Sequence, residues 1–278
     1  MYDEILYEVD DPVATITLNR PEHLNAWTNR MGVEVRHAVG RAEADPGVVG
    51  IIITGAGRAF CAGADMKVLS SISEGASEVD SIAGDAMEPP PLPPGTPADF
   101  DGTYTWLLAG RKPVIAAING AVAGMAVPIS LCCDLRFMAD DAVYLTAFAQ
   151  RGLIAEWGLS WLLPRLVGPA HAIDLLISSR KVAGPEAAAM GLVNRSMPGA
   201  ELLPFCRSYL EDIAARCSPA SISIMKRQVY AQLHAGLGPA EQESQRLMVE
   251  SFSRPDFTEG VQSFLQKRPP SFQRIGEA

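Results

Sequence analysis

The chain has 278 residues, a formal net charge of −9 and 48% hydrophobic residues. This length suits one large domain or a core domain with an appended subdomain, and the apolar content supports a sizeable core. An acidic chain is a poor candidate for a nucleic-acid scaffold, because phosphate binding needs clustered Lys and Arg. No apolar run has the length that spans a bilayer, and the N-terminus is acidic, so a soluble, cytoplasmic protein is predicted. The cysteines and histidines lack metal-ligand spacing, so we predict no metal site.

The first part of the chain alternates between predicted strands and helices. An Asp-Asp-Pro turn at 10–12 separates two short strands and indicates a hairpin. A β-branched run before the turn at 55–57 predicts a buried strand. The predicted elements are strands at 4–9, 13–18 and 48–54, a helix at 25–41, and the start of a helix near 63–65.

The composition changes between residues 70 and 102. Ser and Gly become frequent, and the proline-rich stretch at 88–95 breaks any regular element. A long loop inside a compact domain is commonly a lid or a binding loop. We predict a flexible lid here, with an irregular surface insert as the alternative.

Strands and helices resume after this loop, and the last third of the chain is helical. The predicted strands are 113–118, 134–138 and 143–146, and the predicted helices are 125–133, 159–166, 169–178, 185–190, 200–216, 219–235, 239–251 and 255–267. A strand-rich first half followed by helices alone predicts an α/β core over 1–198 and a helical region over 199–278.

Two segments sixty residues apart carry the strongest functional signal. Residues 58–66 and 119–128 each follow a β-branched run and are rich in Gly and Ala. Small residues let main-chain N–H groups approach a ligand closely. Two such turns that face each other could stabilise a developing oxyanion between two N–H donors.

An ordered set of short motifs resembles the crotonase superfamily, the enoyl-CoA hydratase/isomerase family. The matching stretches are Asn19-Arg20-Pro21, Leu24-Asn25-Ala26, Ile53-Thr54-Gly55, 60–67 (FCAGADMK), 112–120 (KPVIAAING), 133–137 (CDLRF), 163–168 (LPRLVG), 187–193 (AAAMGLV) and 264–268 (FLQKR). They span the chain nearly end to end. Each alone is weak, but their order is highly specific.

The resemblance implies an α/β fold, a ββα spiral core with a C-terminal helical trimerisation subdomain. It also implies an acyl-CoA thioester as substrate, a homotrimer or a dimer of trimers, and no cofactor beyond the CoA of the substrate. The main-chain N–H groups of Ala64 and Met125 match the oxyanion hole of the family. Most relatives have glycine where Met125 stands, so its side chain is expected to narrow or reshape the pocket.

The resemblance further implies a set of residues along the CoA moiety. Its members are Leu24, Ala26, Ala62, Ala64, Asp65, Met66, Lys67 and Lys267. Lys67 and Lys267 match positions that contact the phosphates or adenine, the second sometimes across a subunit interface; ordinary solvated cations are the alternative. Asp65 is also a candidate for bracing the backbone. Tyr144, Gln150 and Arg151 are weaker candidates for the acyl pocket.

The sequence departs from the hydratases at their two glutamates. Pro128 aligns with the glutamate of the helix after the second turn, and a gapless alignment places Phe148 at the other. Neither side chain can exchange a proton, whereas a proline is well tolerated in the first turn of a helix. Hydration by two glutamates is therefore not expected.

Glu156 supplies a carboxylate a few residues further along. The stretch 152–158 (GLIAEWG) resembles the peroxisomal-type Δ3,Δ2-enoyl-CoA isomerases, whose single catalytic glutamate matches Glu156. One carboxyl can take a proton from C2 and return it at C4, and the apolar neighbours Leu153, Ile154, Trp157 and Leu159 would raise its pKa. A surface or helix-capping glutamate is the alternative.

We therefore predict an acyl-CoA enzyme with Glu156 as general acid and base and Ala64 and Met125 as oxyanion donors. Isomerisation is the preferred reaction, and hydration with a single glutamate is the closest rival. A non-catalytic acyl-CoA-binding protein is the alternative from another class. Hydrolase or dehalogenase chemistry is also possible, because related enzymes place a nucleophilic aspartate near Glu156.

Overall fold

The computed structural model describes residues 2–66, 70, 74, 91–94 and 96–276. Lys67 and most of the predicted lid at 70–102 lie outside this part of the chain. No helix within it has the length and apolarity that a membrane crossing requires.

A large sheet forms the centre of the described structure, with the strand order β1-β2-β3-β5-β7-β10. Its strands are β1 (Ile5–Asp10), β2 (Val13–Leu18), β3 (Gly50–Gly55), β5 (Val114–Ile118), β7 (Leu135–Ala139) and β10 (Arg195–Met197). β1 and β2 form the predicted antiparallel hairpin, with Asp10 opposite Val13. The strands from β2 to β10 pair in parallel.

A smaller sheet runs in the order β4-β6-β8-β9. Its strands are β4 (Ala59–Cys61), β6 (Ala121–Ala123), β8 (Val143–Leu145) and β9 (Val182–Ala183). Each of β3, β5 and β7 in the large sheet is followed directly by a strand of the small sheet. The chain therefore winds as a spiral of ββα turns, as the resemblance implied.

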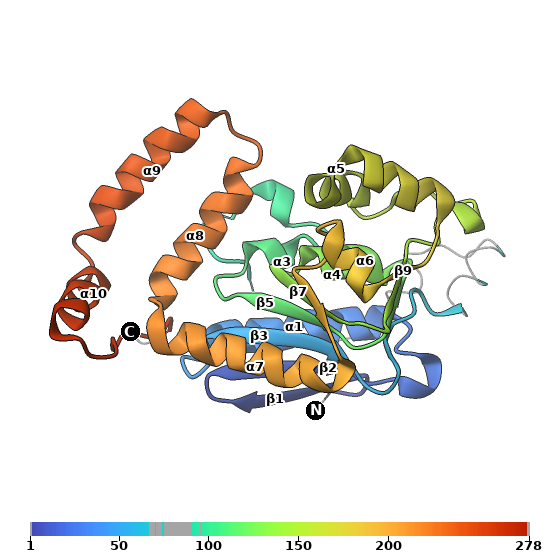
Figure 1. Ribbon diagram of the computed structural model, residues 1–278, viewed down its shortest axis with the longest axis horizontal. Helices are drawn as coiled ribbons and strands as arrows, with labels where there is room; N and C mark the ends of the chain where they lie inside the picture. Colours follow the sequence, from blue (N-terminus) through green and yellow to red (C-terminus); the bar gives the residue numbers. More distant parts are fainter. Residues whose placement is uncertain (1, 67–69, 71–73, 75–90, 95, 277–278) are drawn as a thin grey trace.

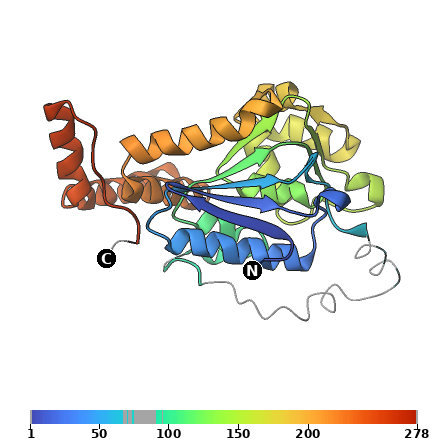
Figure 2. The same cartoon turned by 90° about the horizontal axis from the view of Figure 1, so that it is seen from below.

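Two helices cover opposite faces of the large sheet (Figure 2). α1 (Asn29–Ala44) packs on the strands of the hairpin, and α7 (Gly199–Arg216) packs on β5 and β7. The core between them is apolar: Ile16, Ile51 and Ile115 have no exposed surface. The other helices of the core within the described residues are α3 (Trp106–Ala109), α4 (Ala126–Cys132), α5 (Leu159–Ser178) and α6 (Gly184–Ala189).

Three further helices lead away from the sheet (Figure 1). They are α8 (Pro219–Gln232), α9 (Leu237–Ser251) and α10 (Pro255–Gln266). A buried ion pair holds α8 to the core, because Lys226 Nζ lies 2.8 Å from Asp134 Oδ2. The domain boundary at 198/199 and the role of 199–278 in oligomerisation stay predictions.

The helix predicted at 25–41 begins four residues later, and the reason is local. Asn25 has a left-handed φ of 55°, and its side chain accepts from Arg20 N–H (2.9 Å) and donates to Ala56 and Ala59 carbonyls (2.9 and 2.8 Å). Thr28 then caps the helix, accepting from Met31 N–H at 3.0 Å. Side-chain bonding of this kind competes with helix formation.

Candidate active site

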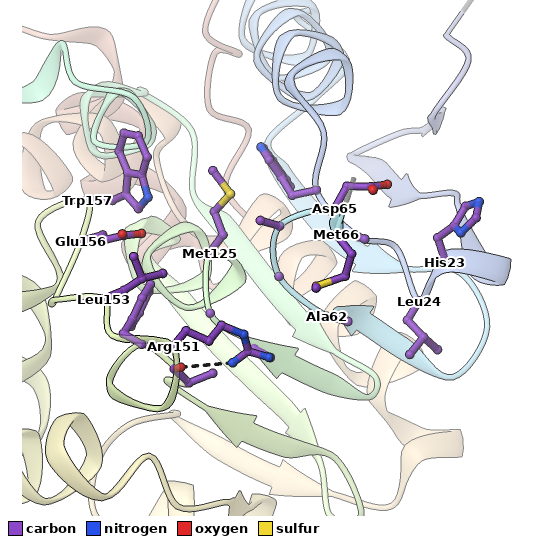
Figure 3. Close-up of a pocket in the computed structure, with 18 of the residues that line it drawn as sticks. His23, Leu24, Ala62, Asp65, Met66, Met125, Arg151, Leu153, Glu156 and Trp157 are labelled. Atoms are coloured by element: carbon purple, nitrogen blue, oxygen red, sulfur yellow. Dashed lines mark hydrogen bonds between the residues drawn. The ribbon is translucent and has the colours of Figure 1, made fainter. Parts of the chain in front are cut away.

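A cavity of about 570 Å³ lies where the small sheet meets the loop before α5. One wall comes from residues between 20 and 29 together with 62–66. The opposite wall comes from residues between 147 and 157, and 123–125 lie between them. Figure 3 shows the side chains of both walls converging on this space. The two glycine-rich turns and Glu156 therefore share one site.

The first turn presents Ala64 through a short backbone pairing. Trp27 N–H donates to Gly63 O at 2.7 Å, and Asp65 N–H donates to Trp27 O at 3.0 Å. Amides in an extended strand alternate in direction, so the N–H of Ala64 points away from Trp27. Gly63 has a φ of 102°, and a Cβ there would lie 2.9 Å from Ala123 O. The two turns thus touch each other.

The second turn presents Met125 at the start of α4. Gly124, with a left-handed φ of 49°, donates to Leu145 O at 3.1 Å, and Val127 N–H donates to Gly124 O at 2.9 Å. Met125 lies in the chain between Gly124 and Val127, whose N–H groups form these two hydrogen bonds. Within the part of the chain described, the N–H groups of Ala64 and Met125 donate to no other residue. Two N–H donors from touching turns are therefore available beside the cavity.

A pairing of the small sheet brings the two turns together. β4 and β6 run in parallel, with Ala59 opposite Ala121 and Cys61 opposite Val122. Asn119 fixes the ends of the large-sheet strands, accepting from Gly55 N–H (3.1 Å) and donating to Gly55 O (2.9 Å). β4 and β6 were not predicted, because each has only three residues.

Glu156 faces the cavity from the loop that precedes α5 (Figure 3). The residue is half-buried, and its carbonyl accepts from Leu159 N–H at 2.9 Å at the start of the helix. Trp157 follows with a φ of 54°, an outlier for a bulky residue that costs about 1–2 kcal/mol. Backbone strain of this kind persists where the surrounding structure holds it, commonly at functional sites.

The predicted apolar surroundings of Glu156 hold only in part. Leu153 and Trp157 line the cavity. Ile154 is 76% exposed and Leu159 is fully buried elsewhere, so neither faces the cavity. The prediction failed for Ile154 because the loop has no fixed period, and for Leu159 because it begins α5 and packs into the core.

The two positions that the sequence comparison matched to the hydratase glutamates hold apolar residues. Phe148 lines the cavity and is 4% exposed. Pro128 is buried in the first turn of α4, where the sequence placed it, and does not line the cavity. Neither offers a proton-transfer group.

The residues assigned to CoA divide into three groups. Lys67 lies outside the described residues. Lys267 ends α10, remote from the cavity in this chain, and so does not join the site here (Figure 1). The members that do line the cavity are Leu24, Ala26, Ala62, Ala64, Asp65 and Met66.

Asp65 has a bracing contact within the first wall. Its Oδ2 lies 2.9 Å from Arg20 Nη2, and the same guanidinium bonds Ala26 O at 2.7 Å and Glu4 Oε1 at 3.3 Å. Its carboxylate is therefore neutralised by a cation. Arg20 was matched to the family only as part of a motif, and a lone arginine gave no further signal of this role.

Four other residues lie at or near the site. Arg151 lines the cavity and donates to Ala147 O at 3.1 Å, whereas Tyr144 and Gln150 do not line it. Cys61 lies just before the first turn, and burial raises the pKa of its thiol to about 12. A neutral thiol is a poor nucleophile, so Cys61 is not a candidate for covalent chemistry.

The spiral of parallel strands, with a small sheet stacked on the large one, defines a crotonase fold. The sequence profile of the family described as enoyl-CoA hydratase/isomerase matches residues 8–86 and 95–275. The chain belongs to this family.

Named relatives cover nearly the whole chain. A probable enoyl-CoA hydratase of Rhodobacter capsulatus is 34% identical, over 98% of both chains. A probable enoyl-CoA hydratase of Mycobacterium tuberculosis is 33% identical, again over 98% of both. The crystal structure of an enoyl-CoA hydratase from Bacillus anthracis superposes with a TM-score of 0.85 at 27% identity, covering 99% of this chain and 100% of that one.

Proposed function

We propose that this enzyme shifts the double bond of an enoyl-CoA thioester from C3 to C2, with Glu156 as the only proton carrier. The observation that supports this is the distribution of carboxylates. Among the described residues that line the cavity, Asp65 and Glu156 carry carboxylates, and Asp65 is paired with Arg20. Glu156 therefore provides the carboxylate on the wall opposite the proposed CoA contacts.

The proposed reaction begins with polarisation of the thioester. The N–H groups of Ala64 and Met125 donate to the carbonyl oxygen, and one such donor is typically worth about 3 kcal/mol in the transition state. The Glu156 carboxylate then removes a proton from C2, and the negative charge moves to the thioester oxygen as an enolate. Without this stabilisation the C2 proton is too weakly acidic for a carboxylate.

The second half of the reaction returns the same proton. The protonated Glu156 donates to C4 while the C3=C4 double bond becomes C2=C3 and the enolate collapses. The carboxylate is regenerated, and no electron is gained or lost, so the cycle needs no redox cofactor. One group that works as base and then as acid suits a carboxyl in a partly apolar site.

Hydration is the second candidate, and the names of the relatives favour it. The relatives from R. capsulatus and M. tuberculosis are both named probable enoyl-CoA hydratases. Hydration would require Glu156 to activate water at C3 and to deliver a proton to C2. The apolar Pro128 and Phe148 leave no second carboxyl at the usual positions, and this difference supports isomerisation.

The test uses purified protein and two substrates in parallel. With 3-hexenoyl-CoA, the proposal predicts a rise in 2-enoyl-CoA absorbance, and with crotonyl-CoA it predicts no comparable loss of that absorbance. Hydration of crotonyl-CoA without isomerisation of 3-hexenoyl-CoA would refute it. Tight binding without turnover of either would indicate a non-catalytic binder. Isotope from labelled water in a released acid would indicate a hydrolase.

We also propose that the chain assembles as a trimer or a dimer of trimers. Large apolar side chains are exposed on the helices that lead away from the sheet: Leu237 (86%), Phe264 (82%) and Leu265 (73%). Exposed apolar surface of this kind typically marks an interface. Assembly could also bring Lys267 to the cavity of another copy. Sedimentation velocity tests this, and a monomer at micromolar concentration would contradict it.

A further inference from the structure

Among the described residues, the indole Nε1 of Trp157 has no hydrogen-bond partner, although it is a buried donor in the cavity wall. Buried N–H groups are paired in the great majority of cases, so each exception needs a physical explanation. Trp157 directly follows Glu156 in the chain and both line the cavity; in the view of Figure 3 the ring nitrogen is drawn on the side of the carboxylate. The unpaired donor therefore belongs to the same cavity wall as the group that the proposed function makes the proton carrier, and to the next residue in the chain.

The ring itself is held firmly. Its edge packs against Tyr104, with ring centres 5.6 Å apart and an interplanar angle of 73°. Tyr104 packs in the same way on Trp27, with ring centres 5.9 Å apart and an interplanar angle of 81°. Trp157 and Gly158 both have left-handed φ values, 54° and 77°. The N–H thus cannot turn to solvent without loss of this packing, and its partner must come from within the cavity.

A single proton carrier needs two working positions, one near C2 and one near C4. The indole N–H of Trp157 has no hydrogen-bond partner among the described residues, so it is available to bind the carboxylate in one of these positions. We propose that Trp157 is a positioning residue whose Nε1–H donates to the Glu156 carboxylate at one end of its path between the two carbons. This inference rests on the proposed function and assigns the indole no contact with the reacting carbons.

The electrostatic consequence has a definite sign. A hydrogen bond donated to a carboxylate favours its charged form and lowers its pKa. Loss of the indole N–H therefore raises the pKa of Glu156 when substrate is bound. The other titratable groups that face this region come from both walls and from the loop before α3: Arg20, His23, Asp65, Arg151 and Tyr104. A Trp157→Phe substitution leaves all of them in place.

The kinetic test compares Trp157→Phe with the matched control Trp161→Phe. Phe keeps a ring against Tyr104 and removes only the donor, while Trp161 stacks on His234 and does not line the cavity. A hydrogen bond to a charged group is worth about 10- to 100-fold in rate. We expect kcat of Trp157→Phe to fall by that factor with KM within about twofold. We expect the acidic limb of its pH profile to move to higher pH, and Trp161→Phe to match the wild type.

A spectroscopic test does not depend on turnover. The indole 15N–1H resonance of Trp157, assigned by its loss in Trp157→Phe, is followed with hexanoyl-CoA bound as an unreactive ligand. We expect it to move with pH in the wild type and to be insensitive to pH in Glu156→Gln. A resonance with the same pH response in both proteins would overturn the proposal.

The two proposals fail in different ways. A wild type that isomerises 3-hexenoyl-CoA, with a Trp157→Phe variant of unchanged kcat and pH profile, would refute the role of Trp157 alone. An active Glu156→Gln variant would refute both. A wild type that only hydrates would refute isomerisation, and the same pH profiles, measured on hydration, would then decide the role of Trp157.

Discussion

Substitution of Gly63 tests whether the first turn supplies an oxyanion donor. An added Cβ would lie 2.9 Å from Ala123 O, and the φ of 102° is strained for any L side chain. The conformation alone costs about 1–2 kcal/mol. The contact adds to this, because the 59–64 and 121–125 segments must separate. We expect Gly63→Ala to lower the free energy of unfolding by about 2–3 kcal/mol, or Tm by about 4–6 °C for a chain of this size.

The catalytic effect should exceed what this loss of stability explains. Separation of the turns moves the Ala64 N–H away from the oxyanion position, and loss of one such donor lowers kcat by about 10²- to 10³-fold. Gly168→Ala is the control, because Gly168 has a left-handed φ of 74°, open space for a Cβ and no place in the cavity. Calorimetry and initial rates with 3-hexenoyl-CoA give both quantities. A Gly63→Ala variant that is destabilised as much as Gly168→Ala but has the kcat of the wild type would show that Ala64 has no role in the oxyanion hole.

The remaining predictions concern stability. Lys226→Met breaks a buried pair and leaves the Asp134 carboxylate, also bonded by Tyr230, without its cation. We expect the free energy of unfolding, measured with urea, to fall by about 3–5 kcal/mol while KM stays unchanged. Lys181 is exposed, so the control Lys181→Met should lower it very little. Equal losses in the two variants would contradict the stabilising role of the Lys226–Asp134 pair. The Cys61 thiol has a raised pKa of about 12 in the folded state, so the unfolded state releases its proton first, near pH 9. Stability should therefore fall as pH rises from 9 toward 12, by up to about 1.4 kcal/mol per pH unit from this group. Between pH 8.5 and 10.5, the free energy of unfolding of Cys61→Ala, measured with urea, should fall less steeply with pH than that of the wild type. Identical dependence on pH in the two proteins would contradict the burial of this thiol.

Long periodic elements were predictable from the sequence, because each has one buried face. Residues 199–216 form α7 where 200–216 was predicted, and 114–118 form β5 where 113–118 was predicted. The short elements were missed: β4 and β6 have three residues each, too few for a periodic pattern. Their strand character depends on pairing with each other, which is a tertiary property.

The candidate site shows the same division. The residues of the two turns could be named in advance, because small residues after buried strands mark close backbone approach. The packing of Tyr104 between Trp27 and Trp157 could not, since it joins three segments far apart in the sequence. The unpaired indole donor could not be predicted either, because its position depends on the left-handed backbone at Trp157.

The role of Glu156 is tested most directly by Glu156→Gln, a substitution of almost identical shape. The measurement is the single-turnover conversion of 3-hexenoyl-CoA by wild type and variant, with the affinity of each for hexanoyl-CoA determined by calorimetry. Glu241→Gln, an exposed change on α9, is the control. The account predicts rapid conversion by the wild type and the control, none by Glu156→Gln, and similar affinity in all three. Conversion by Glu156→Gln at a rate near that of the wild type would contradict it.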